Sequence, residues 1–212
     1  MIKYFLIILI PPIIILGNFN YLIFNSNYYQ KLYSKIGVYE TFGNKEVVNE
    51  ATNNLLGYFR GKNKLDYNFY SEQAQLHLKD VRELITLANN FFVLTFIVAL
   101  VSSVVLLAKS HRLFLKALFF SSTFTLLAIL ALSLGLLSFF DPFFLKFHQV
   151  LFDNQAWLFP AEDNLIKLFP PTFFVAFANR LAQNIIFTSL IILSVSTIFL
   201  KKAKRWSLRK YQ

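Results

Sequence analysis

Residues 87–108 read LANNFFVLTFIVALVSSVVLLA, a stretch without a single charged side chain. A helix rises about 1.5 Å per residue, so roughly 20 apolar residues cross the ~30 Å hydrocarbon layer of a membrane. Three other uncharged stretches are long enough to do the same, and they are residues 4–24, 117–140 and 181–200. The sequence therefore predicts four transmembrane helices.

The composition also favours a membrane protein. Of the 212 residues, 56% are hydrophobic and 26 are Phe, which is more apolar surface than a soluble domain of this size can bury. The first stretch follows Lys3, as the core of a signal peptide does. It is longer than the usual ~7–15 residues, however, and no small-x-small cleavage pattern follows it. The chain has no Cys, which excludes disulfides, thiolate metal sites and a Cys nucleophile.

The basic side chains predict the orientation of the spans. An even number of spans places both termini on one side, together with the loop 109–116. Those segments contain ten of the 21 Lys and Arg residues and none of the acids, so the whole net charge of +10 lies there. The positive-inside rule makes that side cytoplasmic. The basic tail, residues 201–212, is then a topology anchor, and its charge requires no nucleic-acid partner. The ten bases are Lys3, Lys109, Arg112, Lys116, Lys201, Lys202, Lys204, Arg205, Arg209 and Lys210.

Residues 25–86 and 141–180 are expected to form a mainly helical extracytoplasmic cap. The complete prediction is an all-α membrane protein of the plasma membrane, with four transmembrane helices and this cap. In the first cap segment we expect a short strand at Val38–Thr41 and an amphipathic helix capped by Asn44. Another helix, capped by Ser71, continues into the second span.

The second cap segment is expected to begin with a short helix at the membrane surface. Asp141 and Pro142 predict its N-cap and first position. Helical spacing places His148 on the apolar face of this helix. Two of the three histidines, His77 and His148, therefore lie just outside the outer leaflet, whereas His111 lies in the basic loop.

The two outer histidines allow three interpretations. In the first interpretation both are structural, with His77 bonded to Asp80 and His148 packed in its helix. Alternatively, they form an acid–base pair, because His exchanges its proton near neutral pH and a carboxylate can orient the ring. As a third possibility they hold a metal with Asp80, Asp153 and Asp163, although the spacing is a weak signature. No Gly-x-Ser-x-Gly or phosphate-binding loop is present.

Several motifs give the chain a resemblance to a known family, the lipoprotein intramolecular transacylases (Lit). The four-span layout with an outer cap agrees as well, so the resemblance covers nearly the whole chain. The matching residues are His77-Leu78-Lys79-Asp80-Val81, Phe147-His148, Phe152, Trp157, Asp163-Asn164-Leu165-Ile166 and Phe169-Pro170-Pro171-Thr172-Phe173-Phe174.

The resemblance implies an enzyme that moves the sn-2 acyl chain of a diacylglyceryl-modified lipoprotein onto the α-amine of its N-terminal Cys. It implies that His77 and His148 are the catalytic pair, that Asp80 orients His77, and that no metal or cofactor takes part. Asp153 and Asp163 are further supporting candidates. Aromatic walls would exclude water from the site, and the residues expected in them are Phe143, Phe144, Phe147, Phe152 and Trp157.

Two rival functions remain open from the sequence. One is a non-enzymatic membrane scaffold or lipid-binding cap protein with structural histidines, and the other is a metal-dependent lipid hydrolase. Loss of activity on substituting both histidines distinguishes the first from the transacylase, and stoichiometric zinc would indicate the second. Whatever the function, we expect a monomer in contact with membrane lipids and no nucleic-acid partner. A transporter is disfavoured because the spans carry no charge.

Overall fold

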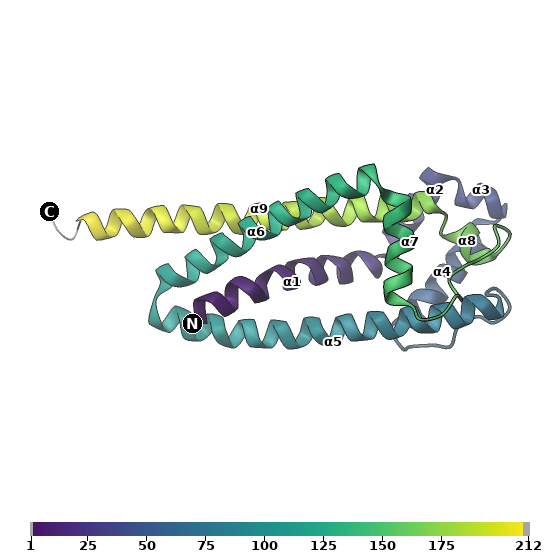
Figure 1. Ribbon diagram of the computed structural model, residues 1–212, viewed down its shortest axis with the longest axis horizontal. Helices are drawn as coiled ribbons and strands as arrows, with labels where there is room; N and C mark the ends of the chain where they lie inside the picture. The colour runs from purple at the N-terminus through teal and green to yellow at the C-terminus, as the bar shows by residue number, and fades with distance from the viewer. Residues whose placement is uncertain (1, 210–212) are drawn as a thin grey trace. The chain divides into compact units, whose positions relative to one another are not determined.

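The computed structural model describes residues 2–209, apart from the side chains of residues 136–138 and 204–209 (Figure 1). All regular elements within these residues are α-helices, which confirms the predicted all-α class. They are α1 (Ile2–Ile23), α2 (Ser26–Ile36), α3 (Val38–Phe42), α4 (Lys45–Phe59), α5 (Glu72–Lys109), α6 (His111–Ser138), α7 (Phe140–Leu151), α8 (Asn164–Leu168) and α9 (Pro171–Arg209).

Four of these helices, α1, α5, α6 and α9, are long and apolar enough to cross a membrane. Each contains one of the predicted spans or most of it, although α6 ends at Ser138 rather than at Phe140. Pro11 and Pro12 lie inside α1 without ending it, as packing against neighbouring helices permits in lipid. Lys204, Arg205 and Arg209 have side chains outside the described set, and Lys210 lies outside the described residues.

The chain divides into two compact units, which are described separately. Unit 1 consists of residues 1–19, 89–134 and 181–212. Its core joins one face of each long helix, through residues such as Leu6, Ala99, Ala117 and Ile185. Many other apolar side chains of unit 1 are exposed, among them Leu94, Val101, Leu127 and Phe187. Such an apolar exterior is typical of helices surrounded by lipid.

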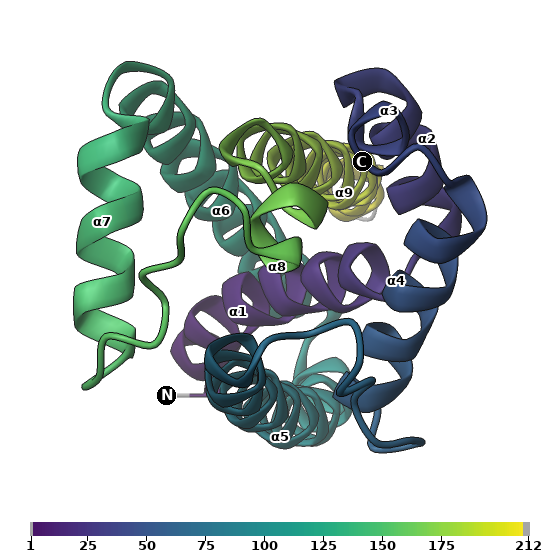
Figure 2. The ribbon, with the colours of Figure 1, turned by 90° about the vertical axis from the view of Figure 1, so that its right-hand side faces the viewer.

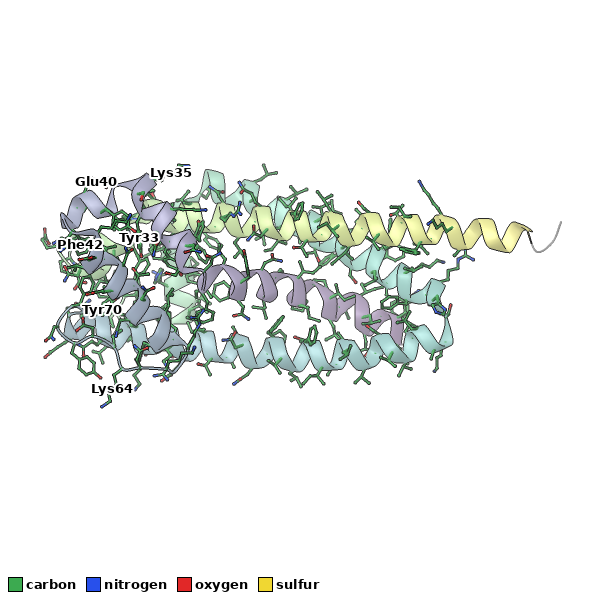
Figure 3. All side chains as sticks on the ribbon, turned by 180° about the vertical axis from the view of Figure 1, so that it is seen from behind. Tyr33, Lys35, Glu40, Phe42, Lys64 and Tyr70 are labelled. Atoms are coloured by element: carbon green, nitrogen blue, oxygen red, sulfur yellow. The ribbon has the colours of Figure 1, made fainter. Side chains whose placement is uncertain are left out.

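Unit 2 consists of residues 20–88 and 135–180, and it contains both His77 and His148. Its core is rich in Tyr and Phe, and Figure 3 labels Tyr33, Phe42 and Tyr70 within it. The buried tyrosine hydroxyls have partners, since Tyr29 bonds the carbonyl of Ile23 and Tyr70 that of Ala51. These bonds let a polar, aromatic sequence form a packed core, because each buried hydroxyl is satisfied.

Two predicted helix starts in unit 2 are confirmed. The Asn44 side chain accepts bonds from the backbone of Glu46 and Val47, and α4 follows it. The Ser71 hydroxyl accepts a bond from the Ala74 backbone N–H at 3.1 Å. From there α5 runs without a break to Lys109, as the sequence predicts.

The strand expected at Val38–Thr41 is wrong, because these residues form the short helix α3. Gly37 explains the difference, since its φ of 81° ends α2 and lets the chain start a second helix at once. The helix α2, which is capped by the side chain of Asn25, is not among the predicted elements. Its apolar residues Tyr29, Leu32, Tyr33 and Ile36 follow helical spacing, and the first three are buried, so this period could have predicted the helix.

The start of α7 also differs from the expectation. The helix begins at Phe140, with Phe139 as an N-cap that makes no side-chain bond, and Asp141 lies within the first turn. The single non-helical residue Phe139 separates α6 from α7, so the new helix starts before the Asp-Pro signal. The prediction that His148 faces the apolar side holds, because His148 is buried.

Candidate active site

His148 is fixed on α7 by its own helix. Its Nδ1 lies 2.7 Å from the backbone carbonyl oxygen of Phe144, one turn earlier. A carbonyl only accepts, so Nδ1 carries the proton and Nε2 of the neutral ring keeps a free lone pair. The ring is only 8% exposed and packs against the Phe144 ring at a centroid distance of 4.3 Å.

His77 lies in the second turn of α5, before the span expected at residues 87–108. Its ring centroid is 6.1 Å from that of His148, with an interplanar angle of 32°. Two imidazoles from distant parts of the sequence therefore meet within unit 2. At this distance both rings can reach one small group placed between them.

Aromatic rings surround both imidazoles. The Phe152 ring lies 4.9 Å from His77 and 5.7 Å from His148, and Trp157 lies 5.0 Å from His148. Phe147 contacts the His148 ring at 5.5 Å. These residues are four of the five expected wall aromatics, counting Phe144. The fifth, Phe143, is 47% exposed and stacks on Phe147 at 6.3 Å.

Phe159 belongs to the same aromatic group, although it is not among the predicted wall residues. Its ring meets His77 edge-on at 5.6 Å. Phe174 reaches the site indirectly, through the Phe144 ring at 5.3 Å. Phe159 precedes Pro160 in a segment without regular structure, where no helical period indicates which way a side chain points. In the sequence, its place beside Pro160 in the loop that contains Trp157 is the feature that could have marked it as a wall residue.

Asp80 binds a different partner from the one expected. Its Oδ2 accepts a hydrogen bond from Nδ2 of Asn154 at 2.8 Å. Among the described residues, Nδ1 of His77 is buried and has no hydrogen-bond partner. Asp80 therefore acts on His77 through its charge, which favours the protonated ring.

The other two supporting candidates lie at different places. Asp163 caps α8, with Oδ1 accepting from Leu165 N at 2.7 Å, and its Oδ2 accepts from the Ser71 hydroxyl at 2.6 Å. It thus joins the starts of α8 and α5. Asp153 is exposed in the turn after α7. Within the described residues, no three His, Cys, Asp or Glu side chains gather at metal-binding distances.

Burial lowers the pKa of His77 to about 4, and the neighbouring His148 contributes in the same direction. The ring is therefore neutral at physiological pH. A neutral ring in an aromatic surrounding donates or accepts a hydrogen bond without carrying charge into the site.

Acidification is expected to destabilise unit 2 through His77. The folded ring has a pKa of about 4 and the unfolded ring about 6.5. Between these values the unfolded chain binds more protons, so the free energy of unfolding falls as the pH drops from about 6.5 towards 4. Thermal denaturation in detergent at about pH 7 and about pH 5 measures the effect. His77→Gln removes this part of the pH dependence, and an equal dependence in both proteins would contradict the assignment.

Comparison with known proteins identifies the family of the chain. Residues 4–174 match the family described as lipoprotein intramolecular transacylase Lit. An in meso structure of the membrane-integral lipoprotein intramolecular transacylase Lit from Bacillus cereus is 22% identical and superposes with a TM-score of 0.87, covering 97% of this chain and 96% of that chain. No curated protein matches the chain.

Two variants of the Bacillus cereus protein, with a histidine replaced by arginine or by alanine, are also 22% identical. Both have a TM-score of 0.82 over 97% of this chain, and the match covers 93% and 94% of theirs. At this identity the structural likeness shows the fold, while the match over residues 4–174 shows the family. The chain belongs to the lipoprotein intramolecular transacylase (Lit) family of acyltransferases.

Proposed function

We propose that this chain moves the sn-2 acyl group of a diacylglyceryl-modified lipoprotein onto the α-amine of its N-terminal Cys. The observation that carries the proposal is the 6.1 Å approach of the His77 and His148 rings among aromatic side chains. Ester and amine belong to one molecule, so the enzyme mainly holds them together. Positioning of this kind is worth roughly 7–11 kcal/mol of a barrier.

His148 is the general base in this proposal. Its Nδ1–H donates to the Phe144 carbonyl, so Nε2 offers a lone pair. The α-amine of the substrate has a pKa near 8, and its neutral form, which has released the ammonium proton to solvent, attacks the ester carbonyl. His148 takes a proton from this nitrogen as the N–C bond forms and gives it to the glyceryl oxygen as the C–O bond breaks. The proton balance of the isomerisation therefore closes on one residue.

His77 stabilises the oxyanion. A buried N–H without a partner is rarer than a buried acceptor without one, so the neutral ring carries its proton on Nε2 and leaves Nδ1 bare. Nε2–H is then a donor for the negative oxygen of the tetrahedral intermediate. The lowered pKa of His77 keeps the ring neutral near pH 7, so the ring remains a hydrogen-bond donor of fixed tautomer. The two imidazoles thus divide the work, one accepting a proton and one donating a hydrogen bond.

The aromatic surround suppresses hydrolysis. Water competes with the amine for the ester carbonyl, and rings packed on both imidazoles exclude it. The rings in direct contact with the pair are Phe144, Phe147, Phe152, Trp157 and Phe159.

Orientation and oligomeric state are part of the same proposal. The ten bases of the termini and the loop 109–116 face the cytoplasm under the positive-inside rule. Unit 2 then lies on the outer side of the plasma membrane, where lipoproteins carry their lipid. One chain supplies both histidines, so a monomer surrounded by membrane lipids suffices.

The reaction is an isomerisation, which gives a clear test. A reporter lipoprotein that carries a diacylglyceryl Cys is co-expressed with this chain and analysed by mass spectrometry. We expect an unchanged intact mass, loss of the amine-reactive N-terminus, and fragments of an N-acyl, S-monoacylglyceryl Cys. A fall in mass by one acyl chain would instead indicate a hydrolase. A reporter that keeps its free amine and both esters would contradict the proposal.

A further inference from the structure

The segment between α7 and α8 is fastened to one face of α5. We name residues 153–159 the strap, which the chain forms after it leaves α7 (Figure 2). On α5, Gln73, His77 and Asp80 are spaced by four and three residues, so they share one helix face. Asp80 binds the strap at Asn154, and Gln73 Nε2 donates to the carbonyl of Leu158. The strap is therefore held on both sides of His77.

Asn154 makes three different bonds within this arrangement. Its Nδ2 donates to Asp80 at 2.8 Å, and its Oδ1 accepts from the backbone N–H of Ala156 at 2.9 Å. Its backbone carbonyl accepts from Nε1 of Trp157 at 2.9 Å. One residue thus connects the α5 helix, the turn of the strap and the indole ring.

The indole in turn limits the movement of the His148 ring. The Trp157 and His148 rings lie 5.0 Å apart with an angle of 33°. The Nδ1 bond to Phe144 holds one edge of the imidazole, and Trp157 and Phe144 pack against it. A ring held in this way presents Nε2 in one direction, whereas rotation of the indole would release it.

We propose that Asn154, clamped by Asp80, is a positioning residue that holds Trp157 against the His148 ring. Asp80 then serves the site through Asn154 rather than through a bond to His77. This inference rests on the proposed function for its effect on catalysis, but the clamp itself has a separate readout.

An exchange of the two side chains tests the clamp. Asn154→Asp places two carboxylates face to face and is expected to lower kcat by about 10- to 100-fold, with KM changed less than about threefold, because displacement of about 1 Å can cost that much. The double variant D80N/N154D restores the bond with donor and acceptor reversed. It is expected to recover kcat to within about threefold of the wild type.

A second readout follows Trp157 without using activity. In a Trp206→Phe background, Trp157 is the one remaining indole. Acrylamide is expected to quench the Trp157 fluorescence more strongly when Asn154→Asp is added than in the protein that carries only Trp206→Phe. In the double variant D80N/N154D, quenching is expected to return to the level of that reference protein. Gln155→Glu adds the same charge one residue away, and is expected to change neither kcat nor quenching.

The outcomes separate the two proposals. The clamp is overturned if a folded Asn154→Asp variant keeps a kcat within about twofold of the wild type. It is also overturned if the double variant has a kcat no higher than that of Asn154→Asp. If Asn154→Asp does not accumulate, Asn154→Ala and Asp80→Ala replace it, and their effects on kcat and quenching must then be non-additive. A wild-type protein without N-acyl product defeats the proposed function, while the quenching comparison still decides the clamp.

Discussion

Replacement of His148 by alanine is expected to lower the rate of N-acyl product formation by about 100- to 10,000-fold, the usual contribution of a positioned general base. The Nε2 lone pair is the group that is lost, and the surrounding phenylalanine and tryptophan rings supply no substitute. The same fall is expected for His77→Ala. The double variant is expected to be little worse than either single one, because residues that act as a unit are non-additive. Single-turnover conversion of a purified lipopeptide measures all three.

His111→Ala is the matched control, because it removes the remaining histidine from an exposed position. Its rate is expected to stay within about twofold of the wild type, as for other exposed substitutions. A His148→Ala protein that is folded and keeps half of the wild-type rate would exclude the proposed base. Additive losses from the two catalytic substitutions would instead indicate independent roles.

Tyr33→Ala is expected to reduce the free energy of unfolding of unit 2 by about 3–5 kcal/mol, as large-to-small changes of buried aromatic residues do. The side chain is fully buried and its hydroxyl bonds Thr52 at 3.2 Å. Its ring also contacts those of Phe169 and Phe173, at 6.3 and 5.9 Å. Denaturant titration in detergent, followed by the fluorescence of Trp157 in the same unit, measures the change.

Tyr67→Ala provides the comparison within the same unit, since this tyrosine is 63% exposed. Its effect is expected to stay within about 0.5 kcal/mol. A loss below about 1 kcal/mol for Tyr33→Ala would mean that the core around Tyr33 relaxes into the space left behind.

Local signals predicted much of the fold. Uncharged length identified the four long helices, and side-chain caps identified the starts of α4 and α5 at Asn44 and Ser71. The error at Val38–Thr41 shows the limit of such signals. A β-branched residue beside an aromatic one favours a strand locally, but a five-residue helix between two left-handed glycines packs better against α4 and α8.

The site was harder to predict from single residues. Periodicity placed His148 on an apolar face and the acid–base interpretation paired it with His77, but only the family resemblance favoured that interpretation over a structural one. Asp80 was matched to His77 because the two are one helical turn apart. Its bonding partner Asn154 is 74 positions away, which no local pattern indicates. Exposed Asp153 and the helix cap Asp163 show that a carboxylate near a histidine in sequence has several possible uses.

The bond from His148 to the Phe144 carbonyl has an evolutionary consequence. Every amino acid at position 144 supplies the same backbone oxygen, so no substitution there can delete the group that selects the tautomer. Selection of the tautomer therefore places no constraint on the side chain at position 144, and it requires no acidic partner for the base. The chemical state of the imidazole depends on one intact turn of α7, and local unwinding of that turn would abolish it.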